Sequence, residues 1–400
     1  MGTARKIFKT ISKTVTCIIL LALFAVASTS LSPVYRFRSP DPFAGPDIYN
    51  PYRSLDTAYC WKRANFHTHT RVKGIMNECE YWPADVYNAL ERFGYDIVTF
   101  SNHNELTVHP FDTSLQVDVY EHGYNLFKYH KLVFGCDRVR HFDHLLPVFA
   151  FQRQFQIDYL SAGADIIQIN HPLRTGGTSQ RMMERLSGYR LIELDSGRST
   201  ENQYWDWALS AGHYSMGVAN DDLHYPDRSG RIAVRCNFLC CPSATYKDIS
   251  TVLKEGCFYS MRVPDYGKGD WNVKYEKNRH LPYIQDIGLK DESICISLSE
   301  MADSIKVTGQ HHSTLHAGYG TDRLEYRMKD SDSYARITAW FPEGEVIYTN
   351  PFARYDSSVS ESPYDGTPQQ IAVIYTILFN LLALAIATGC LYIIYKIIRS

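Results

Sequence analysis

Short apolar runs alternate with amphipathic stretches along the middle of the chain. Strands are expected at residues 64–66, 96–100, 131–134, 165–169, 190–194 and 214–218. Helices are expected between and after them, at residues 83–93, 151–162, 179–186, 204–211 and 246–255. This alternation predicts an α/β architecture with a parallel sheet, either a closed barrel or an open sheet. Such folds place their chemistry at the carboxyl ends of the strands.

The pattern changes after about residue 262. Strand candidates separated by turn residues follow at residues 293–298, 304–308, 323–328, 335–341 and 345–348. They predict a small β-sandwich. Two stretches rich in Pro and Asp, residues 33–55 and 354–369, are expected to be linkers.

The carboxyl-terminal segment is apolar. Residues 371–395 carry no charged side chain, and Lys396 and Arg399 follow them. At 1.5 Å per residue this segment would measure about 37 Å as a helix, longer than a hydrocarbon core of about 30 Å. We therefore expect a transmembrane helix at residues 370–396 and a cytoplasmic tail at residues 397–400, because basic residues favour the cytoplasmic side.

The amino-terminal segment, residues 1–32, has two interpretations. Arg5, Lys6, Lys9 and Lys13 precede an apolar run over residues 15–27, which fits a removable signal peptide with a small-residue cleavage site. A retained membrane anchor fits equally well. Either way, the domains that follow are expected on the non-cytoplasmic side, whether extracellular, periplasmic or lumenal.

Composition narrows the function further. Among 400 residues, 41 Lys and Arg against 43 Asp and Glu give a net charge of −2, so no basic field exists to bind nucleic acid. The ten cysteines form no CxxC unit with metal-finger spacing, and most are expected to be buried free thiols. The 15 histidines are more informative, because several fall at the ends of expected strands.

Potential metal ligands follow one expected strand after another. They are His67 and His69 after the first strand, His103 after the second, Asp137 after the third, His144 in the next apolar run, His171 after residues 165–169, and Asp222 and His224 after residues 214–218. Side chains two apart on a strand point to the same face, so His67 with His69, or Asp222 with His224, can bind one ion. Imidazole and carboxylate suit Zn, Mn or Fe. One such pair is weak evidence, whereas the whole series predicts a metal site.

The remaining histidines lack this placement and are expected to be surface or partly buried residues. They are His109, His122, His130, His141, His213, His280, His311, His312 and His316.

The series of strand-end ligands resembles the polymerase and histidinol phosphatase (PHP) superfamily of metal-dependent hydrolases. The resemblance covers roughly residues 60–262 and implies a distorted seven-stranded α/β barrel at residues 56–262. Residues 252–260, VLKEGCFYS, resemble the carbaryl-hydrolase-like branch, which implies a β-sandwich-like domain at residues 263–353. The whole chain would then be an α/β barrel, a small β-sandwich and terminal hydrophobic helices.

The resemblance also implies two or three divalent transition-metal ions. His67, His69, Asp137 and Asp222 would hold one ion, and Asp137, His144 and His171 a second. His103 and His224 would hold a third or assist catalysis. Three positions depart from the family pattern: Lys73 stands where a metal-binding Asp is common, Asn102 where an Asp precedes His103, and Asp137 where a bridging Glu is usual.

The expected function is a membrane-anchored phosphoesterase that uses a metal-activated hydroxide on a small-molecule or lipid-headgroup ester. Arg174, just after His171, is the expected catalytic contact to a substrate anion. Two alternatives remain open. The same site could hydrolyse carboxylic esters or carbamates, or a degenerate site could leave a binding or scaffold protein, which Lys73 and Asn102 would favour.

Overall fold

One of the two sheets of the α/β region has six strands. The computed structural model describes residues 2–399 apart from 57–60, 75–76, 197–198 and 201. The sheet has the order β10-β8-β7-β6-β5, and β9 pairs with β8. Its strands are β5 (Val119–His122), β6 (Lys131–Phe134), β7 (Ile166–Ile169), β8 (Leu191–Ser196), β9 (Ser199–Thr200) and β10 (Met216–Asn220).

The direction of these strands decides which residues meet at one edge. Strands β7, β8 and β10 are parallel, whereas β6 is antiparallel to both β5 and β7. The sheet is therefore mixed rather than parallel throughout. The start of β6 lies beside the carboxyl ends of β5 and β7, and the end of β6 lies at the opposite edge.

A second sheet runs from the α/β region into the carboxyl-terminal strands without a break. Its order is β13-β14-β16-β17-β12-β11-β3-β4, with β15 on β14 and with β18 joining β16 to β2. Its strands are β2 (Asp47–Tyr49), β3 (Lys62–Asn65), β4 (Ile97–Val98), β11 (Arg235–Leu239), β12 (Phe258–Arg262), β13 (Ile284–Lys290), β14 (Ser293–Gly309), β15 (Ser313–Arg327), β16 (Tyr334–Trp340), β17 (Val346–Thr349) and β18 (Phe352–Tyr355). Pairing of β12 with β17 makes the junction.

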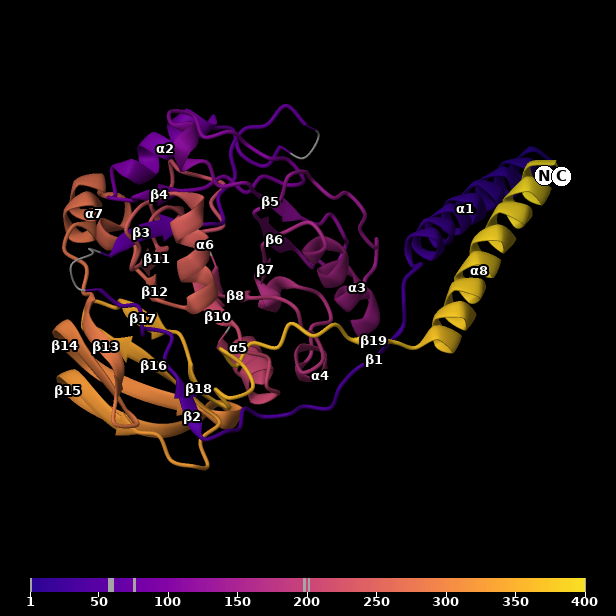
Figure 1. The fold of residues 1–400 in the computed structure, drawn as a ribbon. Helices are drawn as coiled ribbons and strands as arrows, with labels where there is room; N and C mark the ends of the chain where they lie inside the picture. Colours follow the sequence, from indigo (N-terminus) through magenta and orange to yellow (C-terminus); the bar gives the residue numbers. More distant parts are fainter. Residues whose placement is uncertain (1, 57–60, 75–76, 197–198, 201, 400) are drawn as a thin grey trace.

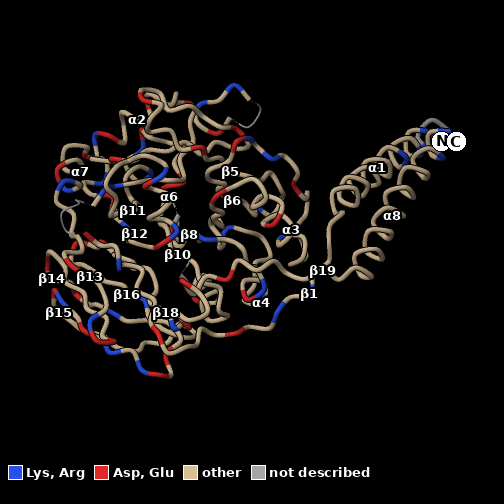
Figure 2. The backbone as a smooth tube through the Cα atoms, viewed as in Figure 1, with Lys and Arg blue, Asp and Glu red and all other residues tan. Residues whose placement is uncertain are grey.

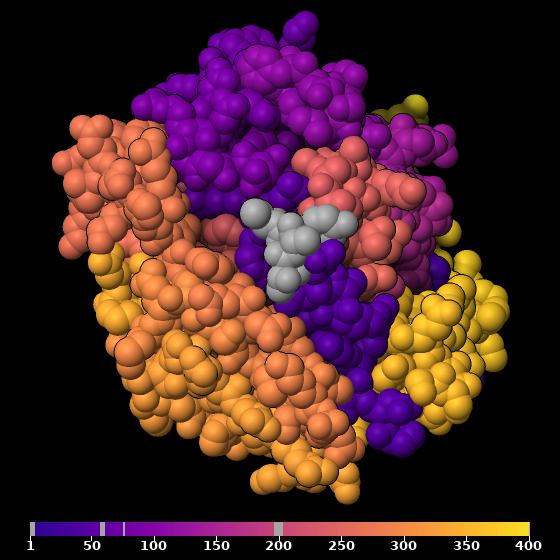
Figure 3. All heavy atoms as spheres, turned by 60° about the vertical axis from the view of Figure 1, so that its left-hand side comes forward, coloured from indigo at the N-terminus to yellow at the C-terminus, as the bar shows by residue number. Residues whose placement is uncertain are grey.

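The mixed α/β architecture agrees with the sequence prediction, but a closed barrel is not found among the described residues. Two single bridges join the ends of β3 and β4 to the two outer strands of the six-stranded sheet: Thr68 pairs with Leu223, just after β10, and His103 pairs with Glu121 in β5. The strands expected at residues 293–298 and 304–308 are one long strand, β14. On the face drawn in Figure 3, the indigo amino-terminal segment lies across the surface between the orange carboxyl-terminal strands and the yellow segment.

Helices cover the sheets where their apolar spacing predicts. They are α2 (Pro83–Glu91), α3 (Ala150–Ser161), α4 (Gln180–Met183), α5 (Asn202–Ser210), α6 (Tyr246–Glu255) and α7 (Trp271–Asn278). Helix α6 buries Ile249, Val252 and Leu253, which share one face at a spacing of three and four residues. It ends at Gly256, whose φ of 96° is a left-handed conformation that glycine adopts without strain. Short 3₁₀ turns are η1 (Thr113–Leu115), η2 (Pro172–Arg174), η3 (Ser229–Arg231), η4 (Tyr266–Gly269) and η5 (Gln310–His312).

The terminal helices form an antiparallel hairpin that projects from the globular part beside α3 (Figure 1). They are α1 (Gly2–Thr29) and α8 (Val373–Arg399), and β1 (Tyr35–Arg36) pairs with β19 (Gln370–Ile371) at their base. Asn380 in α8 accepts a hydrogen bond from the Ser32 amide and donates one to its carbonyl. Both helices are long and apolar enough to cross a membrane, and both are largely exposed, unlike core helices. Figure 2 shows Lys and Arg at the end of the hairpin far from the globular part.

Candidate metal centre

Histidines and acids from both sheets meet at the edge where the two sheets touch. His67 and His69 follow β3, His103 follows β4, Glu121 lies in β5, and Asp222 follows β10. Backbone hydrogen bonds fix this junction: the His69 amide donates to the Leu223 carbonyl, and the Glu121 amide donates to the Asn102 carbonyl. The loops after strands of separate sheets are therefore held against each other.

Two imidazoles and two carboxylates form the most buried group. The Nε2 atom of His67 lies 3.1 Å from Oε2 of Glu121 and 3.2 Å from Oδ1 of Asp222. The Nε2 atom of His69 lies 3.2 Å and 3.3 Å from the same two oxygens. All four residues are buried, and their four ligand atoms lie within 4.8 Å of one another.

The spacing of these atoms fits a shared ion better than direct hydrogen bonds. Two atoms bound at about 2.0–2.1 Å to one tetrahedral zinc ion lie roughly 3.3 Å apart. The Nε2 atoms of His67 and His69 are buried and make no hydrogen bond of acceptable geometry to any described residue, although carboxylate oxygens lie this close. Unpaired buried nitrogen is costly. The donor set therefore fits a divalent transition metal.

Glu121 lies at the centre of a wider set of imidazoles. Its Oε2 atom faces His67, His69 and His103, the last at 3.2 Å. Its Oε1 atom faces the other way, 3.1 Å from Nδ1 of His130 and 3.4 Å from Nε2 of His171. A carboxylate with a different group of nitrogens at each oxygen has the arrangement of a ligand that bridges two ions.

A third possible group lies toward the surface. His103 contacts Oε2 of Glu78 through Nε2 at 2.9 Å, and Nε2 of His224 lies 3.2 Å from the same oxygen. His69, Glu78 and His103 satisfy the spacing for a metal ion. Nδ1 of His224 lies 2.7 Å from the Asp222 carbonyl. If Nδ1 donates to that oxygen, the lone pair of a neutral His224 is on Nε2, the atom that faces Glu78. Three overlapping groups of ligands thus share His69, His103 and Glu121.

Glu193 in β8 supports the centre from behind. Its Oε1 atom lies 3.0 Å from Nδ1 of His67, and its Oε2 atom accepts a hydrogen bond from the His171 amide. The side-chain amide of Asn220 also donates to Glu193. A proton on Nδ1 of His67 then points at Glu193, which leaves the Nε2 lone pair aimed at the centre.

The charges of the centre shift its pKa values strongly. Burial alone would lower the pKa of His67, but the carboxylates of Glu121, Asp222 and Glu193 raise it well above the ordinary value. Burial would raise the pKa of Glu121, but His67, His103 and His130 hold it well below the ordinary value. Burial lowers the pKa of His130 to about 4, so that its imidazole is neutral at neutral pH. A neutral imidazole beside ionised acids is the form that metal binding requires.

Arg174 lies beside the centre at the end of η2, the 3₁₀ turn in the loop after β7. Its guanidinium donates to Oδ2 of Asp222, the oxygen that faces away from His67 and His69. The Nε atom of Arg174 is buried and has no hydrogen-bond partner among the described residues. Asp222 and His171 have positive φ values of 49° and 26°, uncommon for non-glycine residues and concentrated at functional sites.

The structure brings most of the sequence-predicted residues together. His67, His69, His103, His171, Asp222, His224 and Arg174 all lie at or beside the centre. Asn102 is a support residue: its side chain accepts from the Thr70 amide and donates to the Thr70 and Thr107 hydroxyls. Lys73, the other departure from the family pattern, is exposed.

Asp137 and His144 were predicted as metal ligands, but neither lies at the centre. Asp137 follows the carboxyl end of β6, which is antiparallel to its neighbours, so this residue is exposed at the opposite edge of the sheet. The acid among the imidazoles is Glu121. Nδ1 of His144 instead lies against the Thr29 carbonyl at the end of α1, and its Nε2 atom makes no hydrogen bond.

Glu121, His130, Glu78 and Glu193 were not predicted from the sequence. Glu121 lies in the short run VYEH, where it is followed by a second ionisable residue, so that no apolar pattern marks it as a buried carboxylate. His130 precedes β6, and only the antiparallel direction of that strand brings it to the centre. Glu78 is exposed, and no pattern in the sequence marks it as a ligand.

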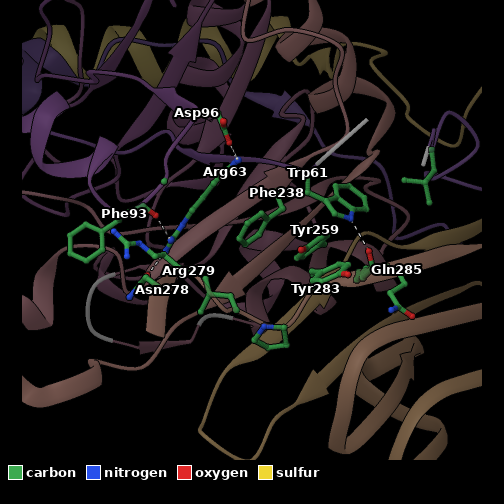
Figure 4. Close-up of a pocket in the computed structure, with 15 residues that line it drawn as sticks. Trp61, Arg63, Phe93, Asp96, Phe238, Tyr259, Asn278, Arg279, Tyr283 and Gln285 are labelled. Atoms are coloured by element: carbon green, nitrogen blue, oxygen red, sulfur yellow. Dashed lines mark hydrogen bonds between the residues drawn. The ribbon is translucent and has the colours of Figure 1, made fainter. Parts of the chain in front are cut away.

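A separate cavity of about 550 Å³ opens at the other end of β3 (Figure 4). Trp61, Phe238 and Tyr259 form its aromatic wall, and Arg63 reaches it from β3. The Arg63 guanidinium donates to the Phe93 carbonyl and to Asn278, as the dashed lines show. None of the residues of the candidate metal centre lines this cavity.

Comparisons with known proteins give one distant structural match. No family model matches the sequence, and no curated protein matches it. A solved two-domain structure from Bacteroides vulgatus ATCC 8482, described as containing a predicted PHP-like metal-dependent phosphoesterase, shares 14% identity with this chain. The alignment covers 78% of this chain and 99% of that one, with a TM-score of 0.38. This match is too distant to assign a fold or an activity to the chain.

Proposed function

We propose that this chain is a membrane-anchored, metal-dependent hydrolase of phosphoric esters. The observation that carries the proposal is the convergence of five imidazoles on the two oxygens of Glu121, with the Nε2 atoms of His67 and His69 buried and unpaired. A purely structural cluster would satisfy those nitrogens with hydrogen bonds. Two or three divalent transition-metal ions, Zn, Mn or Fe, fit the three overlapping groups of ligands.

The chain's own residues divide the work of binding. His67, His69, Glu121 and Asp222 would hold one ion, and Glu121, His103 and His130 would hold another. His171 lies close enough to Glu121 to complete the second group. Divalent ions bound in such sets supply Lewis acidity and lower the pKa of coordinated water.

Arg174 supports a phosphoric ester as the substrate. Its guanidinium is a quarter exposed beside Asp222, and its buried Nε atom has no partner in the described part of the chain. A guanidinium binds phosphate oxygens through two parallel hydrogen bonds. His224, which contacts Glu78 at the outer side of the centre and belongs to neither group of ligands, is the candidate to move a proton to the leaving group.

The hairpin of α1 and α8 supports a membrane anchor. Arg5, Lys6, Lys9 and Lys13 begin α1, and Lys396 and Arg399 end α8, so the basic residues gather at one end of the hairpin. Basic residues favour the cytoplasmic side. We infer that both termini are cytoplasmic and that the globular part lies on the other side of the membrane. No nucleic-acid partner is proposed.

The test uses the full chain purified in detergent. We expect about two or more equivalents of transition metal and hydrolysis of chromogenic phosphate esters, with both lost in His67→Ala and retained in the exposed control His280→Ala. Hydrolysis of carboxylic esters but not phosphate esters would replace the substrate class. Metal-free protein with no activity on either panel would contradict the proposal and indicate a binding or scaffold role.

A further inference from the structure

Exposed apolar side chains cluster on three loops beside the terminal hairpin. We call them the apolar rim: Leu126 (68% exposed), Phe149 (50%), Val148 (49%), Tyr124 (45%), Leu173 (43%) and Phe142 (36%). Single exposed apolar residues are ordinary on a protein surface. Several on neighbouring loops need a partner that removes them from water.

Contacts with both terminal helices show what lies next to the apolar rim. The Leu145 amide donates to the Thr29 hydroxyl at the end of α1, and Leu145 accepts a hydrogen bond from the Leu126 amide. The ring of Phe379 in α8 lies 6.1 Å from the ring of Phe149. The apolar rim is therefore continuous with the base of the two helices that are long enough to span a membrane.

Two of these three loops are built into the candidate metal centre. The loop that carries Tyr124 and Leu126 begins just after Glu121 and ends at His130, and both of these residues belong to the centre. Leu173 lies between His171 and Arg174. The Gly176 amide donates to the Phe127 carbonyl and so ties these two loops together. The part of the apolar rim formed by Tyr124, Leu126 and Leu173 thus lies on loops that border the centre.

A bilayer surface is the occupant that these contacts favour. Tyr and Phe are common at the interface between lipid and water, where rings bury their apolar part. The exposed Lys128, in the same loop as Leu126, can reach anionic headgroups. Because the hairpin fixes the globular part beside the membrane, the apolar rim needs no separate recruitment to reach the lipid.

We propose that the apolar rim inserts into the bilayer surface and that the candidate metal centre acts on an amphiphilic ester that stays embedded in the membrane. The substrate class rests on the proposed hydrolase function, whereas the insertion does not. A water-soluble ester would gain nothing from a border of apolar side chains. A membrane-embedded ester would pass from lipid to the metal centre without leaving an apolar surface.

The first experiment measures insertion and does not depend on activity. The full chain is reconstituted in phosphatidylcholine vesicles with an environment-sensitive fluorophore at position 126, introduced through a bioorthogonal amino acid. The matched control carries the fluorophore at position 319, where Tyr319 is 78% exposed in β15. We expect lipids brominated near the headgroup to quench the label at position 126 and not at position 319. Equal quenching at both positions, or at neither, would overturn the insertion.

The second experiment separates the substrate class from the function. Activity is measured on the ethyl ester of 4-nitrophenyl phosphate in water and on the hexadecyl ester in vesicles. The double variant Leu126→Glu/Phe149→Glu should lose about tenfold on the hexadecyl ester and keep its rate on the ethyl ester, because charge at these positions opposes insertion. Tyr319→Glu should change neither rate. If the double variant loses activity equally on both esters, or loses none, the substrate class is wrong. If the unmodified chain is inactive on both esters, the proposed function is contradicted instead.

Discussion

The Nε2 atom of His67 lies 3.1 Å from Oε2 of Glu121, although the two residues belong to different sheets. His67 follows β3 of the larger sheet, and Glu121 lies in β5 of the six-stranded sheet. The bridge between His103 and Glu121 is one of two that hold these sheets together at the centre. The candidate metal site is therefore also the joint between the two halves of the α/β region.

Replacing Glu121 tests the centre most directly. Glu121→Gln keeps the size of the side chain but removes the charge that both groups of imidazoles face. Partners outside the ligand shell typically contribute 10–100-fold to metal affinity or activity, so loss of a ligand should cost at least about 100-fold. Metal content by mass spectrometry and initial hydrolysis rates measure the effect. Asp137→Asn is the matched control and should leave both unchanged; a loss in Asp137→Asn comparable to that in Glu121→Gln would contradict the assignment.

Glu193 provides a second test, because it touches His67 and lies behind the centre. Glu193→Gln should weaken metal binding by about 10–100-fold, since the neutral amide no longer stabilises the Nδ1 proton of His67. Competition with a calibrated chelator gives the affinity. The exposed Glu276→Gln is the control. Unchanged affinity in Glu193→Gln would show that the contact does not orient His67.

Strand direction explains why Asp137 was predicted in place of Glu121. If all strands are taken as parallel, a polar residue after an apolar run is expected at the carboxyl edge of the sheet, where the metal ligands lie. Strand β6 is antiparallel, so its start carries His130 to the centre and its end carries Asp137 away. Hydrophobic pattern gives a strand's position, but its direction depends on pairing with segments distant in the sequence.

The elements themselves were largely predictable. Helix α6 has the expected bounds because its apolar residues repeat at helical spacing, and β6 has the expected bounds because a short apolar run is flanked by turn residues. Strand β5 was not recognised, since the run VYEH contains two ionisable residues that make it look polar. Burial of that acid and imidazole is explained only by the neighbours that the fold supplies.

Metal affinity should fall as the pH is lowered. His67 has a pKa well above its ordinary value in the metal-free protein, so it takes up a proton as the pH falls through that raised value. A protonated imidazole cannot bind a metal, and binding must then release the proton. We expect proton release on metal binding at pH 7, measured by calorimetry in buffers of different ionisation enthalpy. An affinity that stays constant between pH 6 and pH 8 would contradict the contact between His67 and the carboxylates.

Lys131 makes the free energy of unfolding depend on pH above neutrality. Its amino group is fully buried, donates to the Tyr129 carbonyl at 2.8 Å and to Gln156 at 2.7 Å, and lies over the Tyr129 ring. Burial lowers its pKa from 10.5 to about 7. Between these values the unfolded chain holds the proton and the folded chain does not, so the free energy of unfolding rises with pH.

Lys131→Met should remove that dependence. From pH 7 to pH 10, the unmodified chain should gain stability relative to the variant by up to about 1.4 kcal/mol per pH unit, the value for one proton. Chemical unfolding of the full chain in detergent, with chelator present to uncouple metal binding, measures the difference. The exposed Lys290→Met is the control and should run parallel to the unmodified chain. If the stability of Lys131→Met changes with pH as that of the unmodified chain does, Lys131 is charged in the folded protein. The hydrogen bonds to Tyr129 and Gln156 would then suffice to keep an ammonium in the interior.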